Sequence, residues 1–87
     1  MKVSEFLQTL LSYEMYDEPR LSEEFRKETG HEAGWPTTNN GPIQYARGYE
    51  VAMWCEEKFA GTRESHQFYG RGSQFRAALK ALKEKGL

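Results

Sequence analysis

Apolar residues recur at three- and four-residue spacing in several stretches of the chain, which is the pattern of amphipathic helices. The first stretch runs from Phe6 to Tyr13, and we expect Pro19 to end or bend this helix near Glu18. A second, short helix follows, with Pro19 in its first turn. Gly30 is placed to stop this second helix in a left-handed conformation.

A third and longer helix is predicted from Pro42 to Ala60, closed by Gly61. Glu56 falls in the middle of its apolar face, where a carboxylate needs a partner. We expect an ion pair with an arginine of the C-terminal segment, and the alternative is a catalytic acid. Trp54 falls on the opposite, polar side, where it is either covered by a neighbouring helix or exposed as a binding anchor.

A fourth helix is predicted from Ser73 to Lys85, and residues 30–42 are predicted to form a long irregular loop, since they lack periodicity. Asn40-Gly41 is a turn signal, but its flanks do not alternate, so no hairpin is predicted. Trp35, in the same loop, either covers the core or is an exposed contact residue. The predicted fold is therefore all-α: one domain, residues 1–87, forming a compact bundle of three to four helices.

Composition agrees with one small globular domain. The chain has 87 residues, of which 29% are charged and 38% hydrophobic, as in a soluble protein. No stretch is apolar and long enough to span a membrane, and the N-terminus lacks a signal-peptide pattern. Cys55 is the only cysteine and has no partner for an internal disulfide, so we expect a cytoplasmic protein.

The net charge of −1 conceals an acidic N-terminal third and a basic C-terminal third. Segments of opposite sign either neutralise each other in the fold or present two faces to two partners. An acidic face would compete for a basic channel by imitating phosphate charge. The residues expected on this face are Glu14, Asp17, Glu18, Glu23, Glu24 and Glu28.

Residues of the types that commonly act in catalysis or bind metals are few and lie far apart in the sequence. His31, Cys55 and His66 lie far apart, without the spacing of a metal site. The chain has neither a Walker loop nor a GxGxxG motif. We therefore expect no enzymatic activity, no metal and no cofactor.

Two modes of binding remain. Aromatic residues with nearby arginines are typical of protein hot spots. The candidate anchors for a protein contact are Tyr16, Trp35, Trp54, Phe68 and Tyr69. For RNA, Phe68 and Tyr69 would stack on unpaired bases while cations of the C-terminal segment meet phosphates. Those cations are Arg63, Arg71, Arg76, Lys80 and Lys83.

Two short motifs, Arg47-Gly48-Tyr49 and Ser73-Gln74-Phe75, resemble segments of ribosome modulation factor. The likeness covers Tyr45 to Lys83, and Leu79 stands where the family has a second tryptophan. It implies a two-helix core and association with the small ribosomal subunit.

The chain as a whole is similar in type to small phage-encoded inhibitors, anti-CRISPR proteins included: compact, rich in aromatic residues (14%) and without cofactor motifs. Such proteins work by occupying a surface of host machinery. We therefore expect a non-enzymatic protein-binding domain, an inhibitor or adaptor. The alternative is a small RNA- or ribosome-associated protein that uses the basic C-terminal helix.

Overall fold

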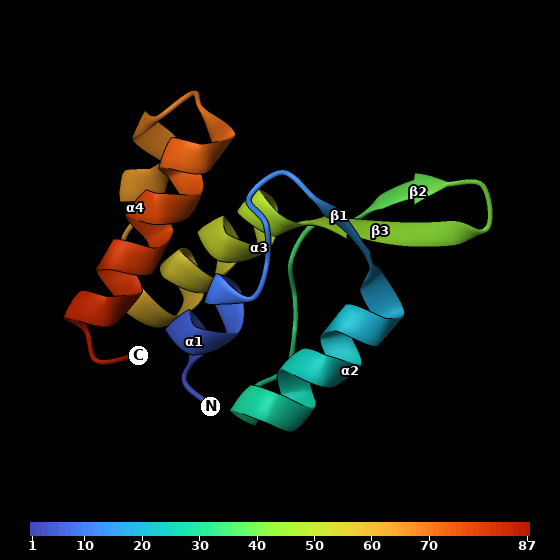
Figure 1. Cartoon of the computed structure of the whole chain (residues 1–87), viewed down its shortest axis with the longest axis horizontal. Helices are drawn as coiled ribbons and strands as arrows, with labels where there is room; N and C mark the ends of the chain where they lie inside the picture. The colour runs from blue at the N-terminus through green and yellow to red at the C-terminus, as the bar shows by residue number, and fades with distance from the viewer.

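A computed structural model describes the whole chain, residues 1–87 (Figure 1). Three helices are grouped at the left of the view, a small sheet extends to the right, and the remaining helix lies below the sheet (Figure 1). The two termini lie near each other, and the Ser4 amide donates to the Leu87 carbonyl oxygen at 3.1 Å. In chain order the elements are α1 (Val3–Gln8), β1 (Met15–Asp17), α2 (Glu18–Thr29), β2 (Thr38–Asn40), β3 (Ile43–Arg47), α3 (Gly48–Cys55), the π-helical turn η1 (Glu56–Ala60), the 3₁₀ turn η2 (Glu64–Gln67) and α4 (Arg71–Glu84).

The prediction of an all-α helical bundle is wrong, because a three-stranded antiparallel sheet joins the helices. The strand order is β1-β3-β2, which makes β3 the central strand. Tyr45 of β3 lies between Asp17 of β1 and Thr38 of β2. The β2–β3 hairpin projects away from the helices (Figure 1).

The hairpin also corrects the predicted loop of residues 30–42 and the predicted helix that follows it. Only residues 31–37 are irregular, and the helix begins at Gly48 instead of Pro42. Gly41 and Pro42 connect Asn40 to its partner Ile43. Gly41 has φ 71°, the positive value that the first central residue of a tight hairpin turn needs.

The first predicted helix is shorter than expected. It ends at Gln8, and β1 forms where the helix was expected to continue towards Glu18. The chain between them crosses the start of α3 closely, since the Gly48 amide donates to the Glu14 carbonyl oxygen at 2.9 Å. A Cβ atom at position 48 would lie 2.1 Å from the Leu11 carbonyl oxygen. Glycine is therefore required at this crossing.

The expectations for the second helix are confirmed. Pro19 lies in the first turn of α2, and Gly30 ends the helix with φ 78°. Leu21 and Phe25 are buried beneath it. Trp35 is 5% exposed and therefore belongs to the core, the first of its two predicted placements.

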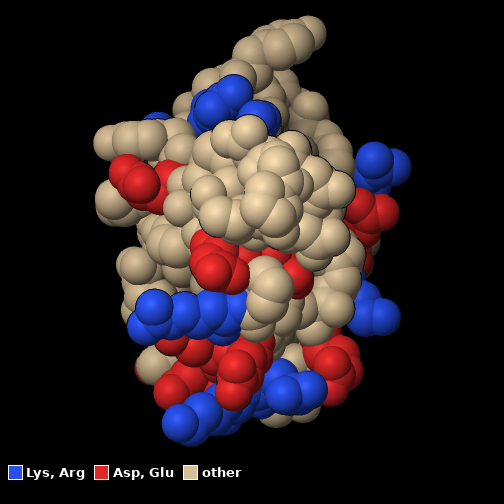
Figure 2. Space-filling model, turned by 90° about the vertical axis from the view of Figure 1, so that its right-hand side faces the viewer, with Lys and Arg blue, Asp and Glu red and all other residues tan.

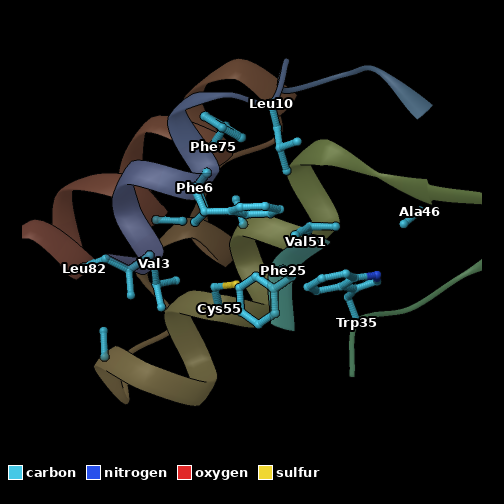
Figure 3. Packing of buried hydrophobic residues seen from close by; sticks show 14 of the residues in the cluster. Val3, Phe6, Leu10, Phe25, Trp35, Ala46, Val51, Cys55, Phe75 and Leu82 are labelled. Carbon is cyan, nitrogen blue, oxygen red and sulfur yellow. The ribbon is translucent and has the colours of Figure 1, made fainter. Parts of the chain in front are cut away.

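The hydrophobic core lies between the four helices, and Phe25 is at its centre (Figure 3). Phe6 and Trp35 contact the Phe25 ring edge-to-face, at centroid distances of 5.3 and 5.1 Å. Val51 and Cys55 line the side of α3 that faces this cluster (Figure 3). Edge-to-face packing of this kind fixes ring orientations as well as burying area.

Glu56 is fully buried, and the ion pair predicted for it does not form. Its Oε2 accepts hydrogen bonds from Thr62 Oγ1 at 2.9 Å and from the Glu64 amide at 3.0 Å. Its Oε1 accepts from the Ser65 amide at 3.3 Å and from the Ser65 hydroxyl. The carboxylate therefore fastens η2 to the end of η1 and sets the start of the segment that leads into α4.

The two segments of opposite charge do not neutralise each other. In Figure 1, α2 and α4 lie on different sides of the molecule. The ion pairs of the chain are Arg20–Glu24 and Arg63–Glu57, and His66 Nε2 lies 4.0 Å from Glu57 Oε2. No helix has the length and hydropathy that crossing a membrane demands.

Candidate functional site

The first candidate surface is one face of the sheet. Alternation along β3 puts Ala46 on the face towards α2, where it is fully buried, and Tyr45 on the opposite face. Ile43 shares the face of Tyr45, and so does Met15, which lies opposite Arg47 on β1. Ile43 is 45% and Met15 46% exposed. We call Met15, Ile43 and Tyr45 the outer sheet face.

The hairpin that carries this face has one charged side chain, Arg47 at the end of β3, which shares the face with Asp17 of β1 at the base of the hairpin. The sequence from Ala33 to Ala46 contains no Asp, Glu, Lys or Arg. Seen from the hairpin end, the molecule shows a broad uncharged area bordered by charged residues (Figure 2). Depletion of charge at the centre, with charge at the rim, is the compositional mark of protein–protein interfaces.

The second candidate surface is a cavity of about 210 Å³ beside α3, which we call the Trp54 cavity. Trp54 is half-buried and contacts Trp35 edge-to-face, with the ring centroids 5.6 Å apart. Its indole ring also lies against Gly34, where a Cβ atom would come within 2.9 Å of Cζ2. The full lining is Pro36, Tyr49, Glu50, Met53, Trp54, Glu57 and His66.

The polar residues that line the Trp54 cavity contact cations outside it. Glu57 lies 3.8 Å from Arg63. The Arg71 guanidinium lies over the Tyr49 ring, 4.9 Å from its centroid. Interaction with Tyr49, and more weakly with Glu50, raises the pKa of the Arg47 guanidinium above its ordinary value. The apolar floor is therefore the part of this cavity without a partner.

The third candidate surface runs along α4. Arg76, Lys80 and Lys83 recur at four- and three-residue spacing, which places them on one side of the helix. None of the three forms an ion pair. Arg76 and Lys80 line two adjoining hollows, of about 310 and 480 Å³. Phe68 lines the first hollow with them. We call these residues the α4 surface.

Tyr69 stands next to the α4 surface and is 99% exposed, while Phe68 is 45% exposed. The Gln74 side-chain amide donates to the Phe68 carbonyl oxygen at 2.6 Å, which ties this aromatic pair to the first turns of α4. Arg71 is separate from this group, because its guanidinium lies over Tyr49.

The acidic residues expected to form one face are interleaved with basic residues. Glu23, Glu24 and Glu28 are exposed on α2, among Arg20, Arg26 and Lys27. Asp17 caps α2 by accepting from the Arg20 amide at 3.5 Å, and Glu18 accepts from the Ser22 hydroxyl. Glu14 is exposed in the chain before β1.

The groups most able to act as nucleophile or base are not brought together. Cys55 is fully buried in the core, and burial raises the pKa of its thiol well above the ordinary value. His31 stacks against Phe59, with ring centroids 4.7 Å apart, and His66 lies near Glu57. No group of three or more His, Cys, Asp and Glu is arranged to hold a metal ion.

Of the predicted binding residues, Phe68, Arg76 and Lys80 are brought into one hollow. Trp54 lines a different cavity, and Trp35 is not available for contact. The outer sheet face was missed by the helical interpretation, although the charge-free run from Ala33 to Ala46 and the turn signal Asn40-Gly41 were visible in the sequence. No protein-family model, curated protein or solved structure matches the chain.

Proposed function

We propose that the chain is a non-enzymatic protein-binding domain that acts as an inhibitor or adaptor by occupying a surface of a macromolecular partner. The observation that carries this proposal is the outer sheet face, on a hairpin whose only charged residue is Arg47 at its base. Half-exposed Ile43 and Met15 leave apolar area in water that a partner surface would cover. Burying the rest of one such side chain contributes about 1 kcal/mol.

The shape of the hairpin also supports binding. Its turn is closed by two residues, and β1 supports the base of β3, so little conformational freedom remains to be lost on association. Pro36, in the same charge-free run, lines the Trp54 cavity. The hairpin and the cavity therefore offer a partner one apolar surface and one recess connected by the same segment.

The test compares two variants of neighbouring residues on β3. Ile43→Asp puts a charge on the outer sheet face, whereas Gln44→Asp puts the same charge on the opposite face. Each purified protein is immobilised and exposed to nuclease-treated lysate from the source organism at about 0.3 M salt, where exposed charge contacts are screened. Thermal unfolding of both variants confirms that they are folded.

We expect the wild-type protein and Gln44→Asp to capture the same partner, and Ile43→Asp to lose it. Capture by folded Ile43→Asp at the wild-type level would contradict the role of the outer sheet face. If the wild-type protein retains no protein partner after nuclease treatment, the proposed function is wrong.

A further inference from the structure

We propose that the α4 surface is a second binding site, specific for single-stranded nucleic acid. Its two components are a row of cations without partners and an aromatic pair fixed at one end of that row. The site is separate from the outer sheet face and does not depend on the proposed protein binding.

The cations supply the phosphate contacts. With a rise of 1.5 Å per residue, Arg76, Lys80 and Lys83 are spaced over about two turns of α4. All three are exposed, and none has an acidic partner within ion-pair distance. Neutralising phosphates with such residues releases counterions from the nucleic acid, which is the main source of affinity in this class of interface.

The aromatic pair supplies stacking. Phe68 shares a hollow with Arg76 and Lys80, so a base stacked on its ring would have its phosphate within reach of the cations. Tyr69, almost wholly exposed, gives the next base a second ring. The Gln74 hydrogen bond to Phe68 at 2.6 Å holds the pair in place on α4.

The pairing of ring and cation favours a single strand over other anionic partners. Bases in a duplex are stacked on each other and have no free face for Phe68 or Tyr69. An acidic polypeptide would meet the cations but leave both rings unused. Two carboxylates, Glu64 and Glu84, line the two hollows, one each. They restrict the strand to the stretch of α4 that carries Arg76 and Lys80.

The experiment measures fluorescence anisotropy of a labelled oligouridylate of about 12 nucleotides, within the usual site size of single-strand binders. Titrations run from about 50 to 200 mM salt. Three phosphate contacts predict that log affinity falls with log salt with a slope of about −2. A DNA duplex and a labelled polyglutamate of similar length serve as comparison probes.

Two charge-reversal variants provide the matched comparison. Arg76→Glu with Lys80→Glu acts on the α4 surface, and Arg26→Glu with Lys27→Glu makes the same change in net charge on α2. We expect the first to lose at least tenfold in affinity for oligouridylate and the second to change it less than threefold. Tyr69→Ala, a fully exposed position, is expected to weaken binding severalfold without altering the salt slope.

Several outcomes would overturn the inference. They are an absence of binding to oligouridylate at about 50 mM salt, equal losses in the two charge-reversal variants, and a preference for the duplex or for polyglutamate. If the α4 double reversal does not fold, Arg76→Gln with Lys80→Gln replaces it, and wild-type affinity in that variant would equally refute the site.

Discussion

At the scale of single residues, Glu56 shows how a fully buried carboxylate is held without a cation. Each of its oxygens accepts one backbone amide, Oε1 from Ser65 and Oε2 from Glu64, and each also accepts one hydroxyl. Charge-assisted hydrogen bonds of this kind offset the cost of removing the carboxylate from water.

Glu56→Gln is expected to lower the free energy of unfolding by about 2–4 kcal/mol. Whichever oxygen the amide nitrogen replaces, one backbone N–H then faces a donor in place of an acceptor. Glu57→Gln is the matched control, because Glu57 is exposed and its contacts with Arg63 and His66 contribute little. Urea denaturation followed by circular dichroism measures both. Equal stability of the two variants would show that the hydrogen bonds of Glu56 do not contribute to the free energy of unfolding.

The sequence predicted that Glu56 is buried but not how it is satisfied. A carboxylate on an apolar helix face suggests a cationic partner, because a long Lys or Arg side chain from another segment can reach it. The actual donors belong to the segment 62–65, and they reach Glu56 only because Gly61, with φ 70°, turns the chain back on itself. Backbone N–H donors are present at almost every residue, so the sequence does not indicate which of them will bind a buried carboxylate.

At the scale of elements, helices were more predictable than strands. Pro19 and Gly30 bracket α2 by local chemistry, so both of its ends could be read directly from the sequence. β3 is five residues long, and its Tyr45 and Ala46 also fit the helical spacing that continues into α3. A strand this short has too few alternations to outweigh the longer period beside it.

The candidate surface on a helix was likewise easier to predict than the one on the sheet. Phe68, Arg76 and Lys80 were predicted because α4 is helical and Phe68 lies in the short segment before it. The outer sheet face was not predicted, because it exists only once β1, far away in sequence, pairs with β3. Trp35 is buried for a similar reason, since its ring is covered by Phe25 and Trp54 from other elements.

Gly48→Ala is expected to destabilise the protein by about 2 kcal/mol or more, although alanine normally favours a helix over glycine. The new Cβ atom would lie 2.1 Å from the Leu11 carbonyl oxygen, a backbone atom that moves only if the crossing of the two segments opens. Gly72→Ala in α4 is the control, because its Cβ would meet only the ends of the Arg76 and Ser12 side chains, at 3.4 and 3.9 Å.

We expect Gly72→Ala to be neutral or to stabilise the protein by up to about 1 kcal/mol. Urea denaturation of the pair gives the comparison directly. If both substitutions stabilise the protein, the crossing at Gly48 accommodates a Cβ atom and glycine is not required there.

At the scale of the whole molecule, the cations of α4 are kept apart from the carboxylates of α2. The exposed cations of α4 have no acidic partners, and the carboxylates of α2 are interleaved with the helix's own basic residues. The net charge of −1 therefore hides a basic side on a protein that is acidic elsewhere. Near-neutrality argues against a uniformly basic nucleic-acid binder, but it leaves room for a local basic face.

The separation of the α4 surface from the hairpin predicts that the two sites act independently. In Figure 1 they lie at opposite ends of a molecule 37 Å long, and substitutions so far apart without shared contacts add without coupling. Ile43→Asp should therefore leave the affinity for oligouridylate within about twofold of wild type. Arg76→Glu with Lys80→Glu should still capture the protein partner at about 0.3 M salt.

Anisotropy and capture assays on the same two variants measure this independence, and the combined triple mutant should show both losses at their single-variant sizes. If Ile43→Asp weakens oligouridylate binding as strongly as the α4 reversal does, the two surfaces share one ligand. The hairpin would then extend a single binding surface and would not be a separate protein contact.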